Sequence, residues 1–154
     1  MSVKDVNITS YWLLGFIEGD GCFSINKGNN FRLDFSLTQS SPNLALLQKI
    51  KFFLENLPGT NEDFANVIGI STVKSNKLNQ YPAVRIETTR IPFITDIFIP
   101  LLEGLTWRSK KYLDFQDWKN ILLLKAQGHH LTETGAELIY LVLSQMNNNR
   151  LSIK

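Results

Sequence analysis

Residues 9–40 read TSYWLLGFIEGDGCFSINKGNNFRLDFSLTQS, a helix-forming run followed by two runs in which apolar residues alternate. Thr9 or Ser10 can cap a short helix, and Gly21 is a natural end for it. The alternation in 22–26 and 31–39, on either side of a turn at 27–30, predicts a β-hairpin with one polar face. Because a helix of about ten residues is marginal alone in water, we expect it to pack against the rest of the chain.

The same order of elements is repeated downstream. A proline at the first helical position and an amphipathic stripe predict a second helix, and two further alternating runs predict two more strands. Helix, strand, strand, helix, strand, strand, helix indicates an α+β fold, an antiparallel sheet with helices on one face. The expected elements are a helix at 41–57, strands at 66–75 and 82–89 joined by 75–81, a helix from about Pro92 interrupted near Pro100, helices at 109–127 and 132–146, and a polar tail at 147–149.

Composition fits one folded domain, residues 1–154. The chain is 44% hydrophobic and 19% charged, with a formal net charge of +2, which excludes disorder and a polycationic tail. The single cysteine, Cys22, cannot form an internal disulfide, so secretion is disfavoured. No uninterrupted apolar run reaches about 18 residues, and the N-terminus lacks the pattern of a signal peptide. We therefore expect a soluble protein.

The first helix carries two glycines, Gly15 and Gly19, on one face, with Trp12 on the same stripe, while Leu13, Phe16 and Ile17 form the other apolar side, which we expect to pack. Each glycine inside a helix costs about 1 kcal/mol relative to alanine, which favours close approach by a second helix at this face. The alternative is that one glycine is tolerated and the other is a cap.

Two carboxylates, Glu18 and Asp20, fall at the carboxyl end of this helix, where the macrodipole is negative. If two copies of the helix pack through their glycine faces, two Asp20 side chains approach each other, and a divalent metal would neutralise them. The alternative is that Asp20-Gly21 is only a helix-ending turn.

Residues 13–21, LLGFIEGDG, resemble the nine-residue signature of the LAGLIDADG homing endonucleases. They match its leading leucine, the glycines at its third and ninth positions, and the acidic residues at its sixth and eighth. Two later segments, KKYLDFQDW at 110–118 and HHLTETG with MNNNR between 129 and 150, also resemble stretches of that family. With the repeated order of elements, the resemblance covers most of the chain.

The resemblance implies an αββαββα saddle with additional C-terminal helices, whose concave sheet lies along the DNA major groove. Paired signature helices would form the interface, here through Trp12, Gly15, Glu18 and Gly19. Because the signature occurs once, it implies a homodimer, although the chain as half of a two-motif polypeptide stays open. LLEGL at 101–105 echoes the signature but lacks its paired acid and final glycine, which indicates a core helix.

The resemblance also implies an active site. Asp20 would be the ligand of Mg²⁺ or another divalent metal, with Gly19 beside it in the metal site, and Glu18 would be structural. Gln39 matches a polar residue that positions water, and Lys110 or Lys111 matches a lysine that stabilises the scissile phosphate. The ordinary alternatives are a strand end for Gln39 and a solvated helix start for the lysines. His129, His130 and Cys22 are not expected to act in catalysis.

The polar faces of the predicted strands are the expected DNA-reading surface. Arginine and lysine can address guanine, and asparagine can address adenine, in a major groove wide enough for a β-ribbon. A solvated sheet face would look similar in sequence. The expected DNA-binding residues are Ser24, Asn26, Arg32, Asp34, Ser36, Thr38, Thr72, Lys74, Arg85 and Glu87.

The leading functional hypothesis is a homodimeric, Mg²⁺-dependent DNA endonuclease that cuts both strands of a long, near-palindromic site. The alternatives are an RNA maturase that assists intron splicing, a catalytically inactive DNA-binding module of the same fold, and a small-molecule regulatory α+β domain. Richness in isoleucine, phenylalanine and asparagine, together with the resemblance, points to an intron reading frame in a mitochondrion or chloroplast. Double-stranded DNA is the expected partner, with RNA in the maturase case and no membrane.

Overall fold

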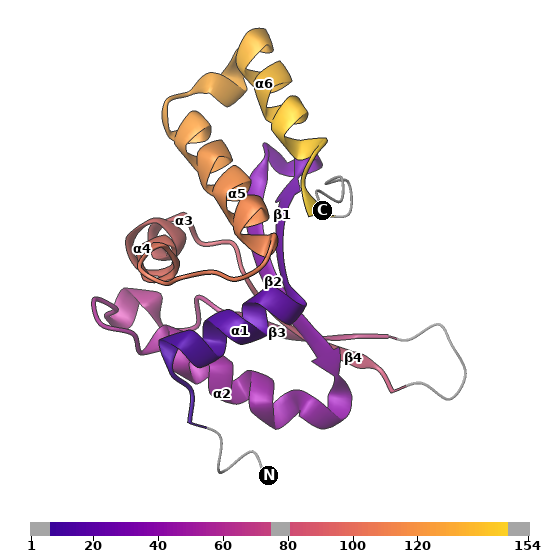
Figure 1. Ribbon diagram of the computed structural model, residues 1–154, viewed down its shortest axis with the longest axis vertical. Coiled ribbons are helices and arrows are strands. Elements are labelled where there is room, and N and C mark those ends of the chain that lie inside the picture. Colours follow the sequence, from indigo (N-terminus) through magenta and orange to yellow (C-terminus); the bar gives the residue numbers. More distant parts are fainter. Residues whose placement is uncertain (1–6, 75–80, 148–154) are drawn as a thin grey trace. The chain divides into compact units, whose positions relative to one another are not determined.

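The structure is a computed structural model that describes residues 7–74 and 81–147 (Figure 1). The chain forms two compact units, the first made of Met1–Gly21 and Phe35–Thr106 and the second of Cys22–Asp34 and Trp107–Lys154. That the whole chain acts as one domain stays a prediction. Across the described residues, no helix combines the length and apolar character that a membrane span requires.

The predicted order of helices and strands is confirmed in the described part of the chain. The connection predicted at 75–81 falls almost entirely outside the described residues. The elements are α1 Ser10–Asp20, β1 Gly21–Asn26, η2 Lys27–Asn29, β2 Arg32–Ser40, η3 Ser41–Asn43, α2 Leu44–Glu55, η4 Glu62–Phe64, β3 Gly69–Val73, β4 Ala83–Thr88, α3 Ile91–Phe93, the π-helical segment η5 Ile94–Phe98, α4 Ile99–Glu103, α5 Lys111–Ala126, η6 His129–Leu131 and α6 Glu133–Leu143.

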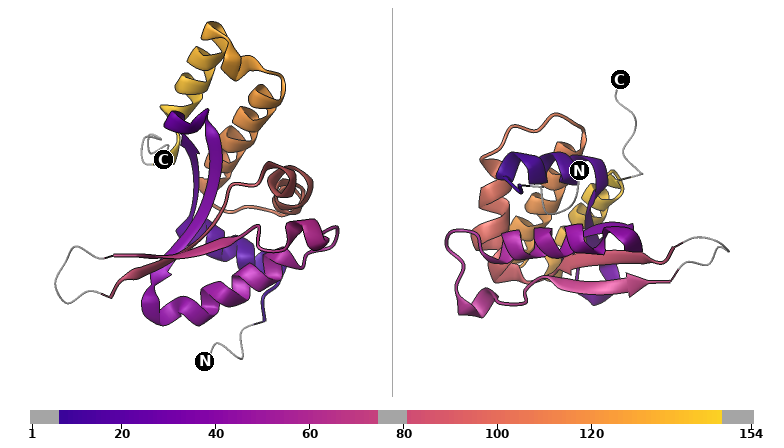
Figure 2. Two further views of the ribbon diagram at one scale, coloured as in Figure 1. Left: turned by 180° about the vertical axis from the view of Figure 1, so that it is seen from behind. Right: turned by 90° about the horizontal axis from the view of Figure 1, so that it is seen from below.

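Within the described residues, one sheet joins the strands in the order β1-β2-β4-β3. The β2–β4 and β3–β4 pairs are antiparallel, with Leu37 opposite Ile86 and Gln39 opposite Val84. In the first unit, α1 and α2 lie on the same side of β3 and β4 (Figure 2, right). The buried side chains of β2 and β4 face a core completed by these helices, as the alternation predicts.

Helix α1 is fixed at both ends by local contacts. The Thr9 side chain accepts a hydrogen bond from the Trp12 backbone N–H at 3.1 Å, so Thr9 is the N-cap, one of the two residues that the sequence offered for this position. At the other end the Gly21 N–H donates to the Ile17 carbonyl, and a Cβ at Gly21 would lie 2.8 Å from that oxygen. Only glycine fits there, so the end of α1, and with it Asp20, has a defined place.

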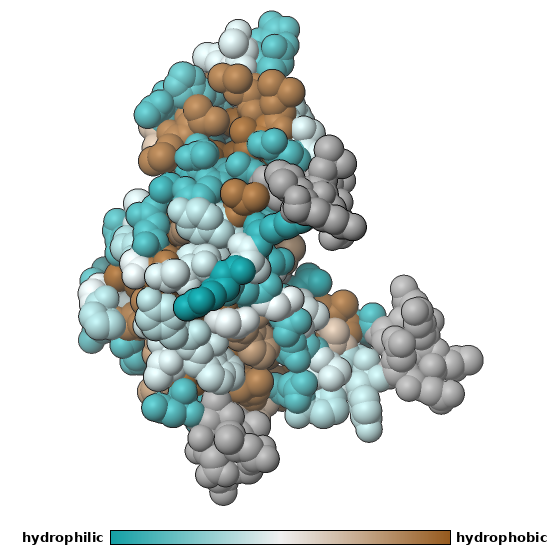
Figure 3. All heavy atoms as spheres, viewed as in Figure 1, coloured by the Kyte–Doolittle hydropathy of each residue, from teal (hydrophilic) through white to brown (hydrophobic). Residues whose placement is uncertain are grey.

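The second unit is built around aromatic contacts between the β1–β2 hairpin and the α5–α6 pair. The Trp118 indole, fully buried, donates to the Ser24 carbonyl at 3.0 Å and lies 5.1 Å from the Phe23 ring, centroid to centroid. Phe31 meets Tyr140 edge-on at 5.3 Å. Apolar residues also cover the outer surface over α5 and α6 (Figure 3), where Leu138 is exposed.

Asn147 does not belong to the predicted polar tail. Its backbone N–H donates to the Asp114 carboxylate at 2.9 Å, and its side-chain amide donates to the Phe23 carbonyl at 2.8 Å. Its φ is +56°, a left-handed conformation in which asparagine is favoured over most residues. Asn147 therefore ties the end of the helical pair to α5 and β1, whereas Asn148 and Asn149 lie outside the described residues.

We expect Asn147→Ala to lower the free energy of unfolding by about 2 kcal/mol, because it removes one hydrogen bond and places a Cβ in the left-handed region without compensation. Asn147→Gly should cost less, about 1 kcal/mol, since glycine keeps the backbone conformation and loses only the side-chain bond. Chemical denaturation measures both. The control is Leu131→Ala at a side chain that is 75% exposed, with an expected change within about 0.5 kcal/mol. Equal losses for alanine and glycine would contradict the backbone part of this explanation.

Candidate active site

Asp20, the last residue of α1, is exposed and is held by a chain of side-chain amides. The Gln39 Nε2 donates to the Asp20 carboxylate at 3.0 Å, and the Asn43 Nδ2 donates to the Gln39 Oε1 at 3.2 Å. These residues come from α1, the end of β2 and the η3 turn. The structure therefore brings together Asp20 and Gln39, two of the four predicted catalytic residues.

The strand register explains why Gln39 meets Asp20. Gln39 lies opposite Val84, a buried residue, and so faces the side of the sheet on which α1 lies. A carboxylate only accepts hydrogen bonds, so Gln39 must present its NH₂ group to Asp20 and keeps its oxygen for Asn43.

Asn43 was not predicted from the sequence. Its position depends on η3, whose first residue, Ser41, donates its N–H to the Pro82 carbonyl at 2.9 Å. Nothing in the local pattern of 39–43 indicates that this turn returns to the strand end, so its contact with Gln39 could be found only from the fold.

The surroundings of Asp20 favour a cation. The carboxylate lies at the negative end of the helix, where the backbone carbonyls of the last turn, that of Gly19 among them, point toward the helix end. These oxygens are the hard ligands that Mg²⁺ and Ca²⁺ prefer. Within residues 7–74 and 81–147, no three His, Cys, Asp or Glu side chains lie together as a group that could hold a metal ion.

The glycine face of α1 is open. Among the described residues, a Cβ added at Gly15 or Gly19 would have no neighbour within 4 Å beyond the helix itself, while Leu13 and Ile17 are fully buried on the inner side of the helix. Glu18 is half-buried. The sequence therefore placed the two faces of the helix correctly.

Phe16 is an exception to that assignment. We expected it on the packed side of α1, but it is only half-buried and stacks on Trp12, with the ring centroids 5.5 Å apart. The two rings thus border the glycine face.

The predicted catalytic lysines lie at the start of α5, in the second unit. Lys110 precedes the helix and is exposed, and Lys111 is its half-buried first residue. Their participation with Asp20 stays a prediction.

The register defines which strand residues share the polar face in the first unit. Ser36 lies opposite Glu87 and Thr38 opposite Arg85, and the Arg85 Nε donates to the Thr38 hydroxyl at 3.1 Å. Four predicted DNA-binding residues are thus neighbours on one face.

The placement of Thr72 on this polar face is wrong. Thr72 lies opposite the buried Val84 and so shares the helix-facing side. Lys74 lies beyond the end of β3, and its role in DNA binding stays a prediction. Ser71, opposite Arg85, takes the polar position on β3 instead. The face that each β3 side chain occupies depends on the pairing register of β3 with β4, and the alternation of residues alone does not define that register.

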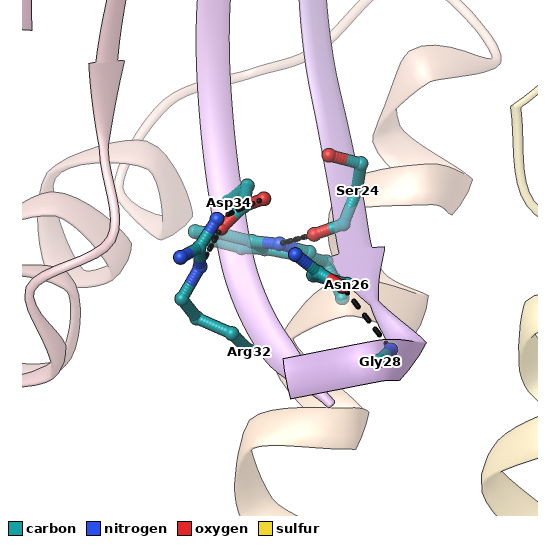
Figure 4. Close-up of polar contacts among 6 residues, drawn as sticks. Ser24, Asn26, Gly28, Arg32 and Asp34 are labelled. Atoms are coloured by element: carbon teal, nitrogen blue, oxygen red, sulfur yellow. Dashed lines mark hydrogen bonds and ion pairs between the residues drawn. The ribbon is translucent and has the colours of Figure 1, made fainter. Parts of the chain in front are cut away.

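The hairpin carries the other four predicted residues. Ser24, Asn26, Arg32 and Asp34 project from the same face of β1 and β2 (Figure 4). The Arg32 guanidinium contacts Asp34 through two hydrogen bonds, and the Asn26 carboxamide oxygen accepts from the Gly28 N–H at 3.1 Å.

A helix that ends in a carboxylate, beside an antiparallel sheet with a polar face, is the arrangement that the sequence resemblance implies. The family model described as LAGLIDADG endonuclease matches residues 13–122. The chain belongs to this family.

Individual proteins and solved structures are also similar to the chain. The probable intron-encoded endonuclease Cox1-I1b of Schizosaccharomyces pombe is 33% identical over 122 residues, which is 73% of this chain and 27% of that protein. The uncharacterized mitochondrial protein RF1 of Saccharomyces cerevisiae is 28% identical over 93% of this chain and 32% of its own length. The crystal structure of the LAGLIDADG homing endonuclease I-GzeII with its DNA target superimposes with a TM-score of 0.75 at 28% identity, covering 96% of this chain and 47% of that one. The chain thus spans half or less of these relatives, and the predicted fold class is confirmed.

Proposed function

We propose that this chain is a DNA endonuclease that cuts both strands of a long, near-palindromic site with a divalent metal held at Asp20. The observation that carries the proposal is the bond from Gln39 to Asp20 at the exposed end of α1, next to the open glycine face. Family membership supports DNA as the substrate. The names of two relatives support an intron-encoded protein of the mitochondrion.

In this proposal each residue has a physical role. Asp20 supplies a carboxylate oxygen to the metal, and Gln39, supported by Asn43, holds that carboxylate in one orientation. A divalent metal bound there would activate water and neutralise charge on the phosphate. The polar sheet faces hold the duplex in register, and Lys110 or Lys111 stabilises the scissile phosphate.

In this proposal the active enzyme contains two copies of the C-terminal end of α1, each carrying one Asp20. One chain contributes one α1 with an open glycine face, so we propose that two copies pair through Trp12, Gly15, Glu18 and Gly19. The larger size of the relatives leaves a second motif in a longer polypeptide as the other source of the partner helix.

The test is selection of cleaved molecules from a randomised duplex DNA library. With Mg²⁺, the cleaved fraction should converge on one near-palindromic sequence, and EDTA should suppress cleavage. A parallel incubation with intron RNA measures splicing. Splicing assistance without any DNA cleavage would overturn the proposal in favour of the maturase alternative.

A further inference from the structure

Asn43 makes an unusual choice of hydrogen-bond partner. It occupies the N-cap position of α2, where an asparagine side chain normally accepts a hydrogen bond from an N–H group of the first helical turn. In this structure its side chain makes no such bond, and its Nδ2 donates instead to the Gln39 Oε1 at 3.2 Å. Asn43 is exposed, so water could satisfy the same groups, and the bond adds only modestly to folding stability. Helix capping and stability therefore do not account for this contact.

The turn that carries Asn43 is anchored from outside α1 and β2. The Ser41 N–H donates to the carbonyl of Pro82, which comes directly before β4, at 2.9 Å. Pro42 follows Ser41 in η3, and its ring fixes one backbone dihedral angle of the turn. Asn43 thus projects a short side chain from a restrained backbone, whereas Gln39 has one more rotatable bond to restrict.

The Gln39 amide can face Asp20 in two ways. With its NH₂ group toward the carboxylate it donates, as observed at 3.0 Å, whereas a half turn would place its oxygen against another acceptor. A donor at residue 43 supports the first orientation, because it occupies the Gln39 oxygen on the far side.

The Gln39 bond also separates the two oxygens of the Asp20 carboxylate. Oδ2 accepts from Gln39, while Oδ1 has no hydrogen-bond partner among the residues that the structure describes. A carboxylate held through one oxygen presents the other in a restricted direction, and carboxylate oxygens are the ligands that Mg²⁺ prefers.

We propose that Asn43 is a positioning residue for cleavage, which acts through Gln39 to keep the Asp20 Oδ1 oriented toward the divalent metal. Asn43 itself contacts neither metal nor DNA. This inference rests on the proposed function, and it adds a residue from outside the signature helix and the oxygen of Asp20 that binds the metal.

The experiment replaces Asn43 by side chains that form different hydrogen bonds. Asn43→Lys can only donate and keeps a donor on the Gln39 oxygen, Asn43→Asp can only accept and competes for the Gln39 NH₂ group, and Asn43→Ala does neither. Each variant is also made together with Gln39→Leu. Asn56→Asp is the matched control, because Asn56 is an exposed asparagine at the opposite end of α2 whose amide donates to the Phe52 carbonyl at 2.8 Å. Thermal melting confirms that each variant is folded.

The first measurement is single-turnover cleavage of the selected duplex with protein in excess, as a function of Mg²⁺ concentration. Asn43→Asp should lower the rate by about 10- to 100-fold, Asn43→Ala should lower it by about 3- to 10-fold, and Asn43→Lys should stay within about threefold of the wild type. Charge alone predicts the reverse order, because an added carboxylate attracts a cation and an added ammonium repels it. With Gln39→Leu present, the three substitutions should differ by less than about threefold. Asn56→Asp should cleave like the wild type.

The second measurement needs neither metal nor DNA. Heteronuclear NMR spectra of the metal-free protein report the side-chain NH₂ groups, and the Gln39 signals are those that disappear in Gln39→Leu. They should move more in Asn43→Asp than in Asn43→Lys, because the acceptor at residue 43 draws the NH₂ group away from Asp20.

The outcomes separate this inference from the function on which it rests. A wild type that cleaves no duplex would overturn the proposed function and the positioning role together. Gln39 signals that stay in place in Asn43→Asp, or cleavage by that variant at the wild-type rate, would overturn the role of Asn43 alone. If Asn43→Asp loses as much in the Gln39→Leu background as in the wild type, Asn43 acts directly on metal or DNA and not through Gln39.

Discussion

Asp20→Asn is expected to abolish cleavage while DNA binding and folding remain intact. The substitution keeps the size of the side chain and an oxygen that can accept the Gln39 hydrogen bond, but it removes the charge that a divalent metal requires. A metal contributes several kcal/mol of transition-state stabilisation, so we expect a loss of about a thousandfold or more in the cleavage rate. Single-turnover cleavage and electrophoretic mobility shifts on the selected site measure the two properties.

Asp20→Asn should increase the folding stability of the protein even though it abolishes cleavage. A carboxylate at the negative end of a helix is unfavourable, so Asp20→Asn should raise the free energy of unfolding of the metal-free protein by about 0.3 to 1 kcal/mol. Asp96→Asn, which neutralises an exposed carboxylate on η5, is the matched control and should leave cleavage unchanged. Gln39→Leu should have an effect between those of Asp20→Asn and Asp96→Asn. We expect it to lower the cleavage rate by about 10- to 100-fold, because the Asp20 carboxylate stays in place but loses the hydrogen bond that orients it. Equal cleavage by wild type and Asp20→Asn would show that Asp20 has no catalytic role.

The sequence was sufficient for the elements of the fold, because their signals are local. The period of apolar residues gave α1, α2 and the strands, and Thr9 and Gly21 marked the ends of α1. Pro100 is different. It lies in the first turn of α4, directly after the π-helical segment η5, so the predicted interruption is a local widening of the helix. Proline lacks the N–H that a regular turn would use, which accounts for the distortion at this place.

Features that depend on contacts between distant segments of the chain could not be predicted from local sequence patterns. Thr72 was assigned to the wrong face because register comes from the pairing of β3 with β4, whose connection carries no turn signal that defines it. Asn43 and Asn147 are polar residues in irregular segments, and their roles appear only when η3 returns to β2 and the residues that follow α6 return to β1. In each case the sequence suggests only a polar loop residue, whereas the structure shows an asparagine that donates a hydrogen bond to a specific atom, the Gln39 side-chain oxygen or the Phe23 carbonyl.

Gly15→Leu is expected to separate folding from assembly. A Cβ added at Gly15 has no neighbour within 4 Å among the other described elements of the chain, and leucine is a better helix former than glycine. The isolated chain should therefore become more stable by about 0.5 to 1 kcal/mol. The same side chain would stand between two helices packed through their glycine faces. Sedimentation velocity should show loss of the dimer, and cleavage should be lost with it, because two Asp20 residues no longer meet.

The opposite signs of these two effects make the result specific to the interface. A general folding defect lowers stability and activity together, whereas a blocked interface lowers activity while stability rises. Gln48→Leu places the same side chain on the exposed surface of α2 and should change neither assembly nor cleavage. If Gly15→Leu remains dimeric and cuts as well as the wild type, the copies pair through another surface. In that case Asp20 would have to act with ligands other than a second Asp20, and the glycine face would be a feature of this helix without a role in cleavage.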